Sequence, residues 1–165
     1  MLILNYQKIN AFDIANGKGI RVSLFVSGCK FHCKGCFNSQ AWDFNSGYPF
    51  TEKEEQLILE RLKHPDFKGL SILGGDPFWQ DDEGLKQLIS LCEKVHKLGK
   101  DVWIWTGFTW EELINNENKL VLSLVKTCDY LIDGRFVEKE KDLSVPWRGS
   151  TNQRIIDVAL EYQNI

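Results

Sequence analysis

The chain has 165 residues, of which 43% are hydrophobic and 26% charged, and its formal net charge is −3. This length suits one domain with a sizeable core, so residues 1–165 are expected to form a single domain. The slightly negative net charge does not favour binding to nucleic acid. No apolar run approaches the ~20 residues that span a bilayer. The N-terminus lacks the basic start and cleavage site of a signal peptide, so we expect a cytoplasmic protein.

Apolar strands alternate with amphipathic helices along the chain. The run Ile20-Arg-Val-Ser-Leu-Phe-Val26 predicts the first buried strand. A capping box, Thr51-Glu-Lys-Glu54, opens a helix that is expected to run to about Lys63, before His64-Pro65. Further strands are predicted at 69–73, 101–105 and 130–132, with helices at 82–98, from 109 to a break near 115–116, and at 120–126. The tail, 154–160, is expected to begin as a strand.

This alternation indicates the fold class. Strands that alternate with helices imply a parallel sheet with right-handed crossovers. A complete eight-fold barrel needs about 250 residues, so this chain has room for only about four to six βα units. The predicted fold is therefore α/β, an incomplete parallel βα barrel that is open on one side.

Each predicted strand runs directly into a polar segment that contains glycine. In parallel α/β folds, ligands bind at the carboxyl ends of the strands, so these segments are expected to converge on one rim. Each segment alone has a simpler explanation, because glycine is common in ordinary turns. The four segments are Ser27-Gly28-Cys29, Gly74-Gly75-Asp76-Pro77, Thr106-Gly107 and Asp133-Gly134-Arg135.

Three of the five cysteines stand in the loop after the first strand, as Cys29-Lys-Phe-His-Cys33-Lys-Gly-Cys36. An odd count and this crowding favour a metal or redox role over disulfides. Electron-carrier clusters normally use four thiolates, so a loop with three leaves one iron open, which is typical of a catalytic site. Cys92 and Cys128 lie in apolar patterns and are expected to be buried and inert.

His32 allows a second interpretation, in which the loop binds a different metal. Together with the three cysteines it would make a Cys₃His zinc set. Against that, structural zinc sites usually draw their ligands as two separated pairs, and the adjacent His32 and Cys33 would compete around one tetrahedral ion. We therefore expect His32 to be an exposed loop residue.

The cysteine loop after the first strand of an incomplete barrel resembles that of the radical S-adenosylmethionine enzymes. The resemblance implies a 4Fe–4S cluster on Cys29, Cys33 and Cys36, with S-adenosylmethionine on the fourth iron. The segment Gly74-Gly75-Asp76-Pro77 is similar to the Gly-Gly-Glu-Pro segment that receives the cofactor's amino group, although the shorter Asp76 leaves a direct contact open. Thr106 is expected either to line the methionine or ribose pocket or to end a buried strand.

The residues around the last cysteine narrow the resemblance to one branch. Where most members carry a large apolar residue beside adenine, this chain has Gly35, and Phe37 follows Cys36. We expect these three residues to border the cofactor. The pattern is similar to that of the activating proteins of anaerobic ribonucleoside-triphosphate reductase. Three further segments of the chain are similar to these proteins as well, namely residues 13–21, 133–136 and 147–154. This implies hydrogen abstraction from a glycine of that reductase, with an electron donor such as flavodoxin.

Polar residues near the C-terminus are candidates for the rim of the site. They are expected either to line a partner-facing mouth and contact the cofactor's carboxylate, or to form a solvated surface with local ion pairs. They are Arg135, Arg148, Asn152, Gln153 and Arg154.

Three other functions compete with this interpretation. One is an activase for a different glycyl-radical enzyme of the pyruvate formate-lyase type. Another is a radical enzyme for a small molecule, such as a deazapurine synthase. The third is a zinc-stabilised binding module without catalysis, which would not need a convergent rim of strand ends.

Overall fold

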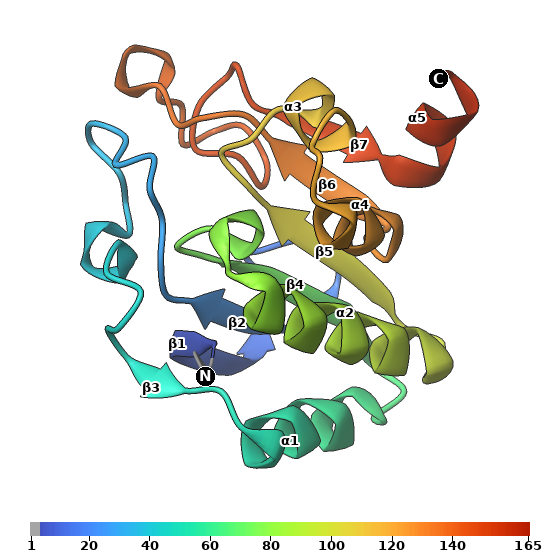
Figure 1. Cartoon of the computed structure of the whole chain (residues 1–165). Coiled ribbons are helices and arrows are strands. Elements are labelled where there is room, and N and C mark those ends of the chain that lie inside the picture. Colours follow the sequence, from blue (N-terminus) through green and yellow to red (C-terminus); the bar gives the residue numbers. More distant parts are fainter. Residues whose placement is uncertain (1–3) are drawn as a thin grey trace.

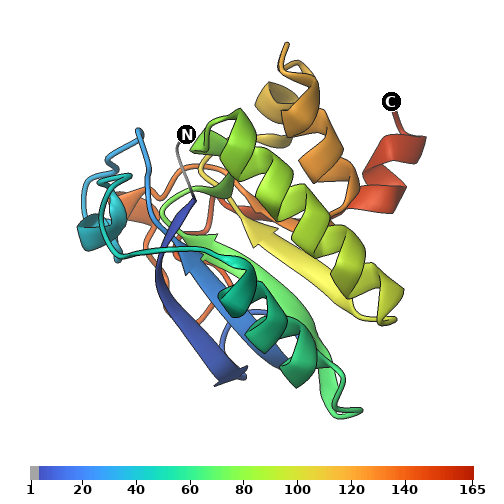
Figure 2. The same ribbon diagram turned by 60° about the horizontal axis from the view of Figure 1, so that its bottom comes forward.

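A computed structural model describes residues 4–165 as one seven-stranded sheet with its main helices on one face (Figures 1 and 2). The strands are β1 (Asn5–Asp13), β2 (Ile20–Val26), β3 (Tyr48–Pro49), β4 (Phe67–Gly74), β5 (Asp101–Trp105), β6 (Tyr130–Asp133) and β7 (Arg154–Asp157). The helices are α1 (Glu52–Leu62), α2 (Asp82–Lys97), α3 (Trp110–Ile114), α4 (Lys119–Lys126) and α5 (Val158–Gln163). Among residues 4–165, no helix is long and apolar enough to cross a membrane.

The strand order is β3-β1-β2-β4-β5-β6-β7. The four central strands, β2, β4, β5 and β6, are parallel, as predicted. The expectation of a parallel sheet is wrong on both sides of this centre, where β1, β3 and β7 run antiparallel to their neighbours. A parallel neighbour needs a crossover of a dozen or more residues, and the connection from β1 to β2 is too short for one.

The predicted elements lie where the sequence pattern places them. The capping boxes at Thr51 and Thr109 both form, and the break after Ile114 separates α3 from α4. The tail begins as strand β7, as expected, and continues as α5. The first strand, β1, was not predicted.

The core lies between the sheet and the helices. Helix α2 buries one face, including Leu85, Leu88 and Val95, and its acidic first turn and basic last turn complement the helix dipole. Cys92 lies on that buried face, and Cys128 is buried after α4, which confirms their predicted placement. Burial raises the pKa of Cys92 to about 12 and places that of Cys128 well above its ordinary value.

The face of the sheet opposite the helices carries a buried polar network around Arg21, which we call the polar floor. Successive strand residues point to opposite faces, so the neighbours of the core residues on β2 and β4 point away from the helices. There the fully buried Arg21 pairs with Asp101 at 2.5 Å and donates through Nε to Ser71 Oγ at 2.7 Å. Ser71 donates in turn to the backbone oxygen of Asn16, at 2.6 Å. This network fixes the loop between β1 and β2 beneath the strand ends.

Candidate cofactor site at the strand ends

A cavity of about 500 Å³ lies at the carboxyl ends of the parallel strands. The four glycine-containing segments meet there, as the topology predicts, and the cysteine loop forms one wall. Most of the residues predicted from sequence to bind the cluster or the cofactor line this cavity. They are Cys29, Cys33, Cys36, Phe37, Gly74, Gly75, Asp76 and Thr106.

Gly35 is the exception. Gly35 is not among the described residues that line the cavity, and it is exposed to solvent. Its φ is +76°, and a Cβ at this position would lie 3.0 Å from the Glu138 side chain. The glycine therefore allows the cysteine loop to turn and to approach Glu138 closely.

The three loop cysteines are free and half-buried on the cavity wall. Burial raises the pKa of Cys29 to about 11 and also raises that of Cys33, which the Phe136 amide and the charge of Arg135 partly oppose. The Asn38 amide donates to Cys36 Sγ at 3.4 Å. Because metals bind thiolates, uptake of iron by these thiols would release protons.

Three thiols on one wall of the cavity are the donor set that a cluster with three thiolate ligands would need. Within residues 4–165, no three His, Cys, Asp or Glu side chains surround a position for a single metal ion. A cubane presents a separate iron to each thiolate, so its ligands need not converge on one point. His32 is exposed, as expected, and stacks on the Trp42 ring with centroids 4.4 Å apart.

Backbone packing explains the two glycines at the end of β4, Gly74 and Gly75. Gly74 has a φ of +110°, and a Cβ on Gly75 would lie 2.5 Å from the backbone oxygen of Gly28. The Gly75 amide donates to Val26 O and the Asp76 amide donates to Gly28 O, both at 2.7 Å. The ends of β2 and β4 are thus held together, which places the cysteine loop beside the Gly-Gly-Asp segment.

Asp76 links the end of β4 to the end of β5. Its carboxylate is 1% exposed and accepts hydrogen bonds from Thr106 Oγ1 at 2.9 and 3.0 Å, and from the amides of Gly107 at 2.8 Å and Phe78 at 3.0 Å. Burial raises its pKa to about 6, although the Gly107 and Phe78 amides, Thr106 and Arg135 act in the opposite direction. Asp76 therefore orders the turn after β5.

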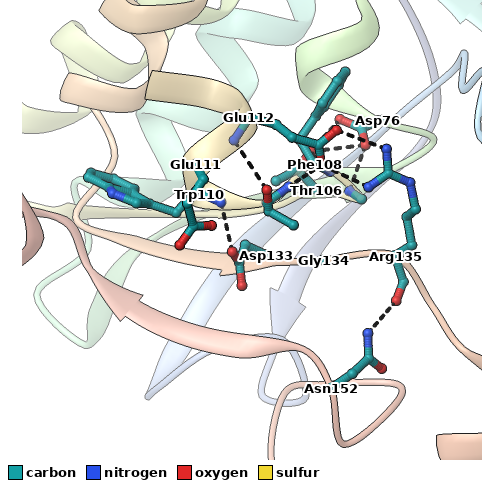
Figure 3. A network of polar contacts seen from close by, with 12 residues as sticks. Asp76, Thr106, Phe108, Trp110, Glu111, Glu112, Asp133, Gly134, Arg135 and Asn152 are labelled. Carbon is teal, nitrogen blue, oxygen red and sulfur yellow. Dashed lines mark hydrogen bonds and ion pairs between the residues drawn. The ribbon is translucent and has the colours of Figure 1, made fainter. Parts of the chain in front are cut away.

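A polar network joins this turn to the segment after β6 (Figure 3). The Gly134 amide donates to Phe108 O at 2.9 Å, and Asp133 accepts from the Trp110 amide at 2.8 Å. Arg135 makes a two-bond ion pair with Glu112 of α3, at 2.8 and 3.0 Å. Three strand ends and the start of α3 are therefore tied together around the rim.

The structure separates the C-terminal polar candidates into two groups. Arg148 and Gln153 line the cavity. The described residues that line the cavity do not include Arg135, Asn152 or Arg154. Arg154 pairs with Asp133 and Glu111, while Asn152 donates to Arg135 O at 2.8 Å.

An apolar wall of the cavity contains residues that were not individually predicted as part of the site, although tryptophans were expected in the core and in the pocket wall. It comes from the cysteine loop and from the irregular segment before β7, and the density of aromatic residues in these segments was its only sequence signal. It includes Phe31, Trp42, Phe136, Leu143, Val145 and Trp147.

Comparison with known proteins agrees with this arrangement. The model of a family described as a 4Fe-4S single cluster domain matches residues 15–156. The solved structure of QueE from Escherichia coli is similar with a TM-score of 0.42 and 15% identity, covering 66% of this chain and 52% of that one.

Two curated relatives show the narrower family. The anaerobic ribonucleoside-triphosphate reductase-activating protein of Pasteurella multocida is 42% identical over 156 residues, which cover 92% of this chain and 96% of the relative. The protein of the same name from Escherichia coli K12 is 40% identical over 154 residues, which cover 91% and 96%. This chain belongs to the family of anaerobic ribonucleoside-triphosphate reductase-activating proteins.

Proposed function

We propose that this protein activates an anaerobic ribonucleoside-triphosphate reductase by radical S-adenosylmethionine chemistry. The observation that carries the proposal is the set of three free thiols, Cys29, Cys33 and Cys36, on the wall of a cavity at convergent strand ends. Cys29, Cys33 and Cys36 would hold a 4Fe–4S cluster, which would supply the electron for reductive cleavage of S-adenosylmethionine and so lead to removal of a hydrogen atom from a reductase glycine.

Residues of the strand ends position the cofactor in this proposal. Gly74 and Gly75 border it at the joined ends of β2 and β4, while Cys36 and Phe37 border it from the cysteine loop, with Gly35 allowing the loop's turn. Asp76 acts mainly through Thr106 and Gly107, because its carboxylate already accepts their hydrogen bonds.

The mouth of the cavity suits a substrate that is itself a protein. Phe37 is 52% exposed and Leu143 is 77% exposed, and both line the cavity. An open parallel barrel, rather than a closed one, would let a reductase loop reach the radical while apolar side chains exclude water. We also propose that the protein works in the cytoplasm and receives its electron from a donor such as flavodoxin.

The first test is chemical. Anaerobically purified protein should contain about four irons per chain, the content of one cubane cluster. With dithionite it should convert S-adenosylmethionine to methionine and 5′-deoxyadenosine. Colourless protein with stoichiometric zinc would contradict the proposal and favour a zinc-stabilised module.

The second test concerns the partner. Incubation with an anaerobic ribonucleotide reductase should produce a glycyl-radical signal by electron paramagnetic resonance. A pyruvate formate-lyase-type enzyme serves as the matched alternative substrate. Radical formation only on that enzyme would assign the chain to the other activase, and cofactor cleavage without either radical would favour a small-molecule substrate.

A further inference from the structure

Arg135 connects the rim network to the cysteine loop. Its guanidinium carbon lies 4.4 Å from the centre of the Phe31 ring, in cation–π contact. Phe31 stands between Cys29 and Cys33 and also packs edge-on against Phe108, with centroids 4.7 Å apart. A fixed positive charge is therefore held against the segment that carries the thiols.

The position of this charge is well determined. Glu112 binds the guanidinium through two hydrogen bonds, and arginine's planar fork makes such a pair directional. Glu112 is itself fixed at the start of α3, where it accepts from the Thr109 amide at 3.0 Å. The backbone oxygen of Arg135 accepts from Asn152, so both ends of the residue are anchored.

The two partners of the ion pair have different positions relative to the thiols. Arg135 stacks on the cysteine loop, whereas Glu112 belongs to α3 and contacts Arg135 from that side. The neutral pair therefore presents its positive end to the cysteine loop. Lys34 in the same loop is 3.8 Å from Glu138, but its side chain is 92% exposed, so solvent screens that pair strongly.

We propose that Arg135 is a positioning residue that holds the cysteine loop through Phe31 and raises the reduction potential of the cluster, while Glu112 moderates this effect. The inference rests on the proposed function, because it requires a cluster on the three thiolates. Reduction adds a negative charge, so a nearby cation favours the reduced state. Net charge near a cluster is among the factors that set its potential.

The experiment is a redox titration of the iron-loaded protein, followed by electron paramagnetic resonance. Arg135→Gln should lower the midpoint potential, because it removes the cation and leaves the Glu112 carboxylate uncompensated. Glu112→Gln should raise the potential, because it removes the moderating anion. Arg135→Lys keeps the charge and should stay closest to the wild type.

Both partners are about 40% exposed, so the charge effect is partly screened. For one charge screened to an effective dielectric constant of about 40, between the values for the protein surface and for bulk water, we expect the ratio of reduced to oxidised cluster at a fixed potential to change by about threefold to tenfold. A tenfold change corresponds to about 59 mV for one electron. Lys94→Gln is the matched control, since it breaks an ion pair with Glu55 on the helical layer, away from the cysteine loop.

Opposite shifts for the two variants are the decisive result. A purely structural pair would loosen the loop in both variants and move the potential in the same direction. Shifts of the same sign, or values equal to those of Lys94→Gln, would overturn the inference. If Arg135→Gln loses its iron, the sign for Glu112→Gln still decides. Wild-type protein without a reducible cluster would overturn the proposed function as well, whereas the titration itself requires no cofactor cleavage.

Discussion

The carboxyl group of Asp76 offers a direct test of the rim geometry, through the substitution Asp76→Asn. The group is buried and its pKa is raised to about 6, from an ordinary value of 3.8. The native state therefore holds a proton that the unfolded chain releases between these two values. In that window, raising the pH favours unfolding, so the wild type loses stability that is fully present below pH 3.8.

The size of the effect follows from the two pKa values. The full difference corresponds to about 3 kcal/mol, and about 2 kcal/mol of it falls between pH 4.5 and pH 7.5. Asparagine has a similar shape and cannot ionise. The stability of Asp76→Asn relative to the wild type should therefore rise by about 2 kcal/mol across this range.

Urea unfolding of the reduced, metal-free protein at several pH values measures this difference. Using the difference between the two proteins removes the titration of every other carboxylate. Parallel curves would refute the raised pKa. A wild type that gains stability with pH relative to the variant would show that the amides of Gly107 and Phe78 outweigh burial.

Three further substitutions test the site and its support. Cys36→Ala should lose bound iron in an iron assay, whereas the buried Cys92→Ala should keep it; equal iron in both would remove Cys36 from the ligand set. Gly75→Ala should cost about 2–3 kcal/mol in urea unfolding because its Cβ would meet the adjacent backbone, whereas Gly99→Ala, which meets no atom within 4 Å, should cost only about 1 kcal/mol for its positive φ. Similar costs would contradict the packing explanation. Arg21→Met should cost about 3 kcal/mol by leaving buried acceptors unpaired, and a loss below about 1 kcal/mol would show that the polar floor contributes little.

The central strands could be predicted because each is a short apolar run that ends at a glycine. Strand β1 could not, because its residues are mostly half-buried and its pairing with β2 is interrupted by register shifts after Tyr6 and after Asn10. Such irregularities break the period-two alternation that reveals a half-buried strand. The antiparallel pairing of β1 was missed together with the strand itself, whereas β7 was predicted as a strand and only the structure reveals its antiparallel direction.

The site was predicted where the chemistry is local and missed where it depends on distant segments. The cysteines and the Gly-Gly-Asp segment are contiguous motifs. The partnership of Glu112 with Arg135 joins residues of α3 and of the segment after β6, and Glu112 already has a complete explanation as a capping residue. Arg21 stands inside an apolar run, and only the fold reveals its partners Ser71 and Asp101.

The separation of the five cysteines into three on the cavity wall and two in the core also affects how the protein responds to air. Thiol oxidation requires both thiolate character and access to the oxidant. Cys92 and Cys128 lack both, because they are buried and their pKa values are raised strongly. The loop thiols line the open cavity, so an oxidant reaches them even though burial also raises the pKa of Cys29 and Cys33. Oxidative damage should therefore fall on the cysteine loop and leave the core intact. Protein whose loop thiols have been oxidised no further than disulfide or sulfenic acid would then be repairable by thiol reduction and a new supply of iron and sulfide, without unfolding and refolding the chain.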